Sequence, residues 1–195
     1  MARLKAKEFE EACLARMEVE EKLGRGTMGR YGVMSYIDID PVTRQIKWQP
    51  VESLPDLEGV IPPVGRQFIA DCKVTSDSGV ELRDDHLPLR QLEHMLRRSR
   101  FGAICFLLLH YNPRELKTKS EPAETFAFPV YEQHPFWVAL RSGAGKRSIN
   151  RDDCREYGVV VDWNLATEQS RIPRPDILAA LWRLMELPIP ETIPG

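Results

Sequence analysis

Apolar residues recur at near-helical spacing in several stretches of the chain. The clearest stretch, residues 3–23, contains no Pro or Gly and predicts a helix that ends before Gly24. A second stripe predicts a helix over residues 86–98, and further helices are expected near residues 150–157 and 175–187. The expected buried positions of the first two helices are Leu4, Phe9, Cys13, Met17 and Leu23, then Leu89, Leu92, Met95 and Leu96.

Other stretches have the pattern of strands. Residues 103–111 are almost continuously apolar, which is typical of a strand covered on both faces. The order of helix, hairpin, strand, helix and strand predicts an α/β fold with a mixed central sheet flanked by helices. The remaining strands are expected at about residues 31–39, 45–51, 125–131, 136–140 and 158–163, with a turn at 40–43 and loops at 112–124 and 188–195.

The stretch from Pro55 to Val74 is the most informative one. Two short apolar runs flank Pro62-Pro63-Val64-Gly65, and Pro and Gly between apolar runs indicate a hairpin. The two-residue period of a strand places Asp71 and Lys73 on one face. The other face then carries Phe68, Ala70, Cys72 and Val74. Since Asp56 stands at the entrance of the first run, two carboxylates and an ammonium are expected to converge at one edge of the hairpin.

Ionised groups are unfavourable inside a protein unless they are paired or bind a metal. Two carboxylates can hold Mg2+, which prefers oxygen ligands, and a lysine can orient an attacking water or stabilise a charged phosphorus centre. The alternative is a structural ion pair between Asp71 and Lys73 on a solvated strand face. The Asp-x-Lys pattern alone favours that simpler interpretation.

The wider spacing favours the catalytic interpretation. Pro55-Asp56, fourteen intervening residues and then Asp71-Cys72-Lys73 resemble the PD-(D/E)xK signature of the restriction-endonuclease-like nucleases. Further segments resemble one branch of that superfamily, the RecU-type Holliday-junction resolvases. These segments are Gly59-Val60, Gly65-Arg66, Gln91-Leu92-Glu93-His94-Met95, Gly102-Ala103-Ile104-Cys105-Phe106, Phe136-Trp137, Gly145-Lys146-Arg147-Ser148-Ile149 and Asp152-Asp153.

This resemblance implies a single nuclease domain over residues 1–195 that uses Mg2+, or Mn2+, to make symmetric nicks in four-way DNA junctions as a homodimer. Asp56 and Asp71 would bind the metal, and Glu10 would support the metal or its water, with Glu11 as the alternative in register. Lys73 would assist water attack and stabilise charge. Gln91, which lies off the apolar stripe of its helix, would position the reacting group.

The sequence departs from the resolvase pattern in two places. Asp71 stands where the family usually has Glu, which keeps the charge and shortens the reach. The protruding stalk of the family would correspond to a shorter hairpin at about residues 30–52, without a Pro-Thr-Pro stretch. Two alternatives therefore stay open: a nuclease of the same superfamily acting on flap, nicked or linear duplex DNA, and a non-catalytic DNA-binding subunit with the same fold.

The net charge of −2 means that any DNA-binding surface must be local. Residues 24–29 satisfy GxGxxG, but a helix precedes them and a strand is expected after them, so a basic flexible loop is expected instead of a dinucleotide site. Residues 142–148 are expected to form a basic turn. The candidate phosphate contacts are Arg25, Arg30, Arg97, Arg98, Lys146, Arg147 and Arg151.

The cysteines and histidines show no metal-ligand spacing. Cys13, Cys72, Cys105 and Cys154 lack a CxxC pair, and reduced packing thiols of a cytoplasmic protein are expected. The first residues do not resemble a secretory signal, because Arg3, Lys5 and Lys7 interrupt any apolar run. Residues 103–109, the longest apolar run, are too short to span a bilayer, so no membrane partner is expected.

Overall fold

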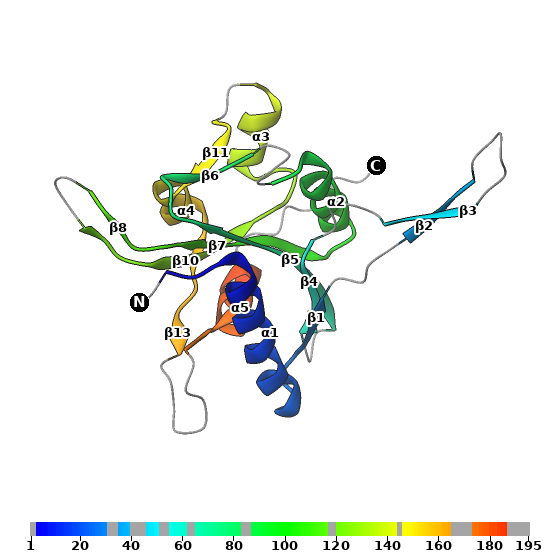
Figure 1. Cartoon of the computed structure of the whole chain (residues 1–195), viewed down its shortest axis with the longest axis horizontal. Coiled ribbons are helices and arrows are strands. Elements are labelled where there is room, and N and C mark those ends of the chain that lie inside the picture. Colours follow the sequence, from blue (N-terminus) through cyan, green and yellow to red (C-terminus); the bar gives the residue numbers. More distant parts are fainter. Residues whose placement is uncertain are drawn as a thin grey trace.

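A mixed sheet runs through the centre of the molecule in a computed structural model that describes residues 3–30, 35–39, 46–50, 55–61, 65–82, 87–116, 120–143, 146–164 and 173–186 (Figure 1). The strand order is β1-β4-β5-β7-β10-β12, and only β5 and β7 pair in parallel. The α/β class and the mixed central sheet predicted from the sequence are therefore confirmed. The bounds are β1 Thr27–Arg30, β4 Leu57–Ile61, β5 Arg66–Thr75, β7 Ile104–Tyr111, β10 Glu124–Pro129 and β12 Val159–Val160.

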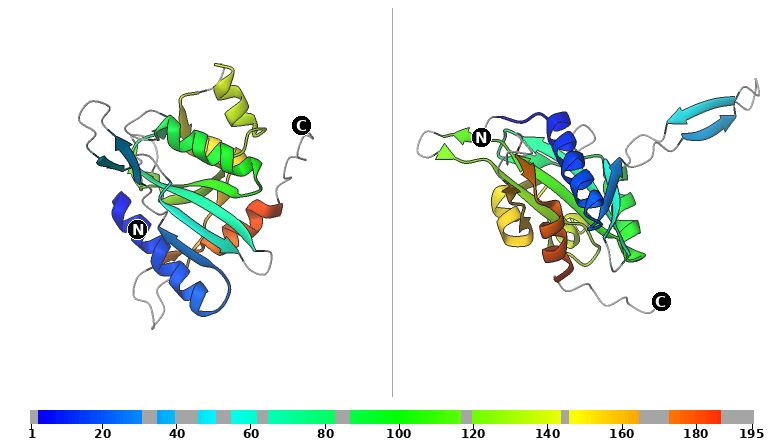
Figure 2. Two further views of the ribbon diagram at one scale, coloured as in Figure 1. Left: turned by 90° about the vertical axis from the view of Figure 1, so that its right-hand side faces the viewer. Right: turned by 90° about the horizontal axis from the view of Figure 1, so that it is seen from below.

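Helices cover both faces of this sheet (Figures 1 and 2). On one face, α1 (Ala6–Lys22) and α5 (Ile177–Glu186) pack on a core that includes Phe9, Phe68 and Phe106. On the other face lie α2 (Leu89–Arg100), α3 (Pro135–Arg141) and α4 (Arg151–Tyr157). The crossover from β5 to the parallel β7 runs through α2, so α2 lies on the face of β5 that carries Ile69. None of the helices in the described ranges is long and apolar enough to cross a membrane.

Short antiparallel strand pairs lie outside the central sheet. An antiparallel ribbon formed by β2 (Ser35–Ile39) and β3 (Ile46–Pro50) projects away from the sheet (Figure 1 and the right view of Figure 2). The other pairs are β6 (Gly79–Glu81) with β11 (Ser148–Asn150), β8 (Arg114–Glu115) with β9 (Ser120–Glu121), and β13 (Trp163–Asn164) with β14 (Arg174–Pro175). The predicted turn at 40–43, the 62–64 connection, residue 86, part of the 142–148 turn and the 188–195 tail lie outside the described residues.

Four sequence predictions of secondary structure are wrong. Residues 136–140 belong to α3 and not to a strand, because Pro135 starts a helix whose next two side chains, Phe136 and Trp137, are both buried. Residues 27–30 form β1 at the edge of the central sheet and not a flexible loop. The expected loop at 112–124 contains the β8–β9 hairpin, and the last helix starts after Pro175, which belongs to β14.

Two expected core positions are also wrong. Leu23 is 57% exposed, because α1 ends at Lys22 and the chain turns at Gly24, whose φ is 67°. Leu89 is 51% exposed at the first position of α2. Leu4 is half-buried just before α1, and the remaining stripe positions of the two helices, including Phe9 and Met95, are buried as predicted. All four cysteines are free and buried, which confirms the packing role expected for them.

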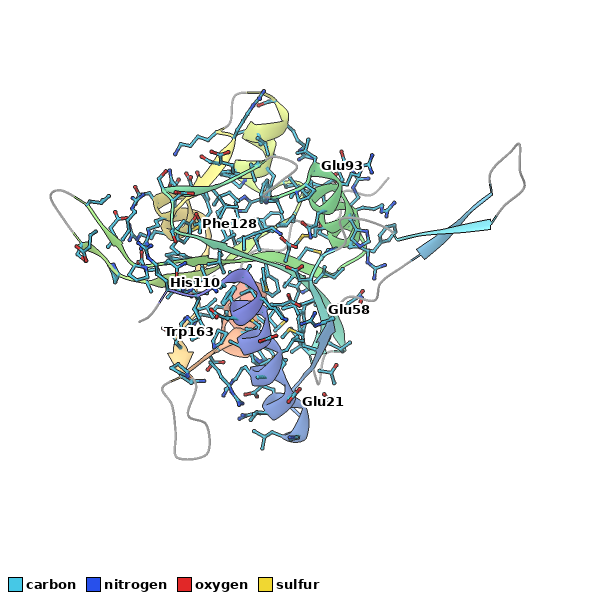
Figure 3. All side chains as sticks on the ribbon, viewed as in Figure 1. Glu21, Glu58, Glu93, His110, Phe128 and Trp163 are labelled. Carbon is cyan, nitrogen blue, oxygen red and sulfur yellow. The ribbon has the colours of Figure 1, made fainter. Side chains whose placement is uncertain are left out.

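Two histidines are buried, one on each side of the sheet. His110 Nδ1 lies 2.8 Å from the hydroxyl of Thr125, and Trp163 donates to the same hydroxyl over 2.8 Å (Figure 3). His134 stands edge-on to Phe128, with the ring centroids 5.4 Å apart. Burial lowers the pKa of each imidazole to about 4.

The two histidines are therefore expected to lower the stability of the fold in acid, against the opposite contribution of buried carboxyls with a raised pKa. Between about pH 6.5 and pH 4 the unfolded chain binds protons at both histidines that the folded chain excludes, so their contribution to the free energy of unfolding falls as the pH drops through this window. Urea unfolding at several pH values measures the slope, and His134→Gln should make it shallower. An identical slope in the variant would contradict this assignment.

Candidate active site

The β4–β5 hairpin builds the candidate site. Leu57 pairs with Ala70 in the antiparallel register, so Asp56, one residue earlier, lies opposite Asp71. Directly opposed residues on such strands have Cβ atoms about 5 Å apart. Phe68, Ala70, Cys72 and Val74 contribute to the core under α1 and α5. Asp71 and Lys73 therefore project to the opposite face, toward α2, as the two-residue period predicts.

Asp71 is the most deeply buried member of the site. The residue is fully buried on β5, which lies between β4 and β7 in the sheet. Lys73 Nζ lies 2.6 Å from Asp71 Oδ2, and the Gln91 amide donates to Asp71 Oδ1. Burial raises the pKa of Asp71 to about 7; the Lys73 ammonium opposes this shift and the Asp56 carboxyl adds to it. The surroundings of Asp71 thus disfavour the ionised form of its carboxyl.

Asp56 is fixed against the neighbouring strand. Its Oδ2 accepts a hydrogen bond of 2.7 Å from the backbone N–H of Cys72. This bond holds the carboxylate beside the Asp71–Cys72–Lys73 segment, near enough for Asp56 to raise the pKa of Asp71. Two carboxyl groups this close repel each other when both are ionised, and a bound cation relieves that repulsion.

Glu10 reaches the site from α1. Its carboxylate is half-buried and pairs with Arg30 on β1 over 3.3 Å. Burial raises the pKa of Glu10, and Asp56 is among the neighbouring charges that raise it further. Glu11, the alternative in register, has a half-exposed side chain that lies 3.9 Å from Lys7. The structure therefore brings Glu10 next to the Asp56 side of the site.

Gln91 is buried on α2, although the apolar pattern of this helix predicts that it lies off the buried stripe. It is 4% exposed on the first turn of α2, so the expectation of a residue off the buried stripe is wrong. The reason is that the first turn of α2 packs over Asp71, and the Gln91 amide supplies a polar partner for that buried carboxyl. Gln91 thus orients Asp71, whatever else it contacts.

The residue types suit a hard divalent cation. Mg2+ takes oxygen ligands and is commonly held by one or two carboxylates, with waters and substrate phosphates completing its shell. Asp56 and Asp71 supply such a pair, and the Asp56 carboxyl adds to the rise in the pKa of Asp71 that burial causes. Within the described ranges, no group of three or more His, Cys, Asp or Glu side chains is arranged to hold a metal.

Four of the seven candidate phosphate contacts form ion pairs within the protein: Arg25, Arg30, Lys146 and Arg151. Arg25 pairs with the buried Glu20 over 2.7 Å, Arg30 with Glu10, and Lys146 with Asp153 over 3.0 Å. Pairing does not remove these three from the surface, because their side chains remain more than half exposed.

Arg151 is different, and its expected DNA contact is wrong. Its side chain is buried, and its guanidinium donates to the carbonyl oxygens of Pro122 (2.6 Å) and Asn112 (2.7 Å) and to Glu124 (2.8 Å). These bonds fasten α4 to the residues at either end of the β8–β9 hairpin. The arginine is therefore structural, because its buried guanidinium is already held by several acceptors of the protein.

The other three candidates lie at the surface. Arg97 and Arg147 are exposed, and Arg98 is half-buried. Arg98 donates to the side chain of Gln67 on β5. Gln67 Nε2 in turn donates to Glu58 on β4 over 3.3 Å (Figure 3). These contacts of Arg98, Gln67 and Glu58 join α2 to the hairpin and are not among the sequence predictions. The two-residue period of β5 could have indicated them, because it places Gln67 on the same face as Asp71 and Lys73.

Comparison with known proteins adds no family to this geometry. No family model matches the sequence, and no curated protein is significantly similar to it.

Proposed function

We propose that this protein is a Mg2+-dependent DNA endonuclease with a restriction-endonuclease-like nuclease fold. One observation carries the proposal: two adjacent strands bring Asp56, Asp71 and Lys73 together, and Lys73 only partly offsets the effect of burial and of Asp56 on the fully buried Asp71 carboxyl. A structural ion pair between Asp71 and Lys73 does not need a second carboxylate beside Asp71, whereas a site for a divalent cation uses such a pair of carboxylates.

Each side chain has a distinct task in this proposal. Asp56 and Asp71 hold the cation, which when bound neutralises charge on the phosphate and makes a water more acidic. Lys73, next to Asp71, orients the attacking water and stabilises the charge that develops on the phosphate oxygens. Gln91 holds the Asp71 carboxylate in orientation, and Glu10 accepts a hydrogen bond from a water on the Asp56 side.

The proposed substrate is branched DNA, cut symmetrically by a homodimer as in the RecU-type resolvases. The position of the β2–β3 ribbon supports a branched substrate. In the chain the ribbon lies between Arg30 of β1 and Leu57 of β4, and these two residues pair with each other in the sheet. The ribbon is therefore rooted at the edge that carries Asp56. A projecting ribbon beside a cutting site suits the open centre of a branch, and two-fold symmetry would place two sites on opposed strands.

A nicking assay tests the proposal. The wild-type protein is incubated with a four-way junction, a flap and the corresponding linear duplex in Mg2+, Mn2+ or chelator, beside Asp56→Asn and Asp152→Asn. Since a bound metal supplies several kcal/mol of transition-state stabilisation, Asp56→Asn should slow cutting by about 10²- to 10³-fold. Asp152→Asn removes an exposed carboxylate on α4 and should cut normally.

The substrates then separate the alternatives. Preferential cutting of the junction supports a resolvase, whereas equal cutting of flap and duplex supports a nuclease of the other type. Binding without cutting in either metal supports the non-catalytic subunit. Cutting that survives both the chelator and Asp56→Asn would remove this site from the chemistry.

A further inference from the structure

A second surface of basic and aromatic residues lies at the other end of α2, and we call it the Phe101 surface: Arg66, Arg97, Arg98, Arg100 and Phe101. The helix ends where β5 and β7 begin, because Phe68 pairs with Ile104. Arg66 Nε donates to the carbonyl oxygen of Gly102 over 2.9 Å, and this bond ties the start of β5 to the turn after α2. Residues from three elements thus meet at one place.

Phe101 is the most exposed large apolar residue in the part of the chain that the structure describes, at 82%. The backbone around it is firmly held: its N–H donates to the Arg98 carbonyl over 3.1 Å, and the Gly102 N–H donates to Ser99 over 3.0 Å. Gly102 turns the chain with a φ of 88°. A rigid turn therefore presents an aromatic ring to solvent, an arrangement that is unfavourable until a ligand covers the ring.

The charge around Phe101 is mostly positive. Across the described ranges, Arg66, Arg97 and Arg98 form no ion pair with an acidic side chain. Arg100 does pair with Glu132, which also contacts Arg141, so that arginine is partly neutralised. Glu93, the acidic residue of α2, lies on its exposed side (Figure 3). Several guanidinium groups thus surround one exposed ring.

A line of polar residues connects this surface to the candidate active site. On α2, Gln91 contacts Asp71, and two turns later Arg98 contacts Gln67. His94, half-buried, lies between them on the helix. Arg66 is five residues from Asp71 along β5, which at about 3.3 Å per residue is a separation of about 17 Å. That length corresponds to about five base-pair steps.

We propose that the Phe101 surface binds an unpaired DNA strand beside the cut, with Phe101 stacked on a base and Arg66, Arg97 and Arg98 holding phosphates. Stacking on an exposed aromatic, combined with arginine contacts to the backbone, is how proteins bind single strands without reading sequence. Duplex DNA keeps its bases stacked within the helix and offers none to the ring. This inference rests on the proposed nuclease function, because it assigns the strand at Phe101 to the same DNA that reaches Asp71.

Binding is measured by fluorescence anisotropy in chelator, so that no cutting occurs, with a short labelled single strand and the matching duplex. Phe101→Ala should weaken single-strand binding by about 5- to 150-fold, the range for one stacked base, and change duplex binding little. Phe101→Trp should restore it. Arg97→Gln should weaken binding to every sequence and lower the salt slope by about 0.7. The control, Trp182→Ala, removes a 42%-exposed aromatic on α5, across the sheet.

Two results would overturn the inference: unchanged single-strand affinity in Phe101→Ala, or an equal loss in Trp182→Ala. The cutting assay separates this failure from failure of the nuclease proposal. If the wild type cuts DNA in Mg2+ and Phe101→Ala binds normally, the nuclease stands and the Phe101 surface is not its contact. If binding depends on Phe101 while no metal supports cutting, the surface stands as a single-strand site and the nuclease falls.

Discussion

Replacing Lys73 by alanine is expected to slow metal-dependent DNA cutting by about 10²- to 10³-fold, the usual effect of removing one preorganised charge from a transition state. The Lys73 ammonium lies 2.6 Å from Asp71 Oδ2, and its side chain is only 19% exposed, so water cannot readily take its place. DNA affinity in chelator should change little, because the lysine acts on the reacting phosphate. Single-turnover rates and anisotropy measure the two effects separately.

The same variant has a second readout. Lys73 opposes the rise in the pKa of Asp71, so its removal should move that pKa still higher and shift the pH dependence of cutting toward alkaline pH. Lys22→Ala, which removes an exposed lysine in the last turn of α1, serves as the control and should change neither rate nor profile. A Lys73→Ala enzyme that cuts at the normal rate with an unshifted profile would exclude the proposed role.

The hairpin and the convergence of its charged side chains could be predicted because both depend on short-range rules. Pro and Gly between two apolar runs specify the reversal, and the strand period alone separates Asp71 and Lys73 from Phe68 and Ala70. The opposition of Asp56 to Asp71 then follows from the register of one hairpin. None of these features requires knowledge of a distant part of the chain.

The errors arose where a distant partner decides the outcome. Residues 136–140 are predicted as a strand, but the core on the α2 side of the sheet contains both Phe136 and Trp137, and consecutive side chains of a strand point to opposite faces. Gln91 lies off the apolar stripe of its helix, and only the fold reveals the Asp71 carboxyl that it contacts. Arg151 is predicted to contact phosphate, and only the fold brings in the carbonyl groups that bind it, which are up to 39 residues away in the chain.

Replacing Asp71 by asparagine is expected to abolish metal-dependent cutting and yet stabilise the metal-free protein. The pKa of Asp71 is raised to about 7 in the folded chain, above the ordinary value of 3.8. A raised pKa stabilises the fold below pH 3.8, and this contribution is lost as the pH rises through 7. Ionised Asp71 thus costs up to about 4 kcal/mol at pH 8, a cost that a neutral amide avoids.

The pH dependence of that difference distinguishes this explanation from a general gain in packing. The free energy of unfolding of Asp71→Asn should equal that of the wild type near pH 4 and exceed it progressively up to about pH 7, because only the wild type must ionise the buried group. Other titrating groups, including His110, are common to both proteins and cancel in the comparison. A difference that stays constant across this range would show that the carboxyl is not strained by its charge.

Magnesium should reverse the order of stability. Binding to the folded state adds RT ln(1 + [Mg2+]/Kd), and this requires the ionised carboxylate, so the wild type should gain stability with increasing Mg2+ at pH 8. Asp71→Asn has one charged ligand fewer beside Asp56 and should gain little. Thermal unfolding over a series of Mg2+ concentrations measures both curves. Parallel curves would mean that the cation binds elsewhere, and that the close approach of Asp56 and Asp71 has another purpose.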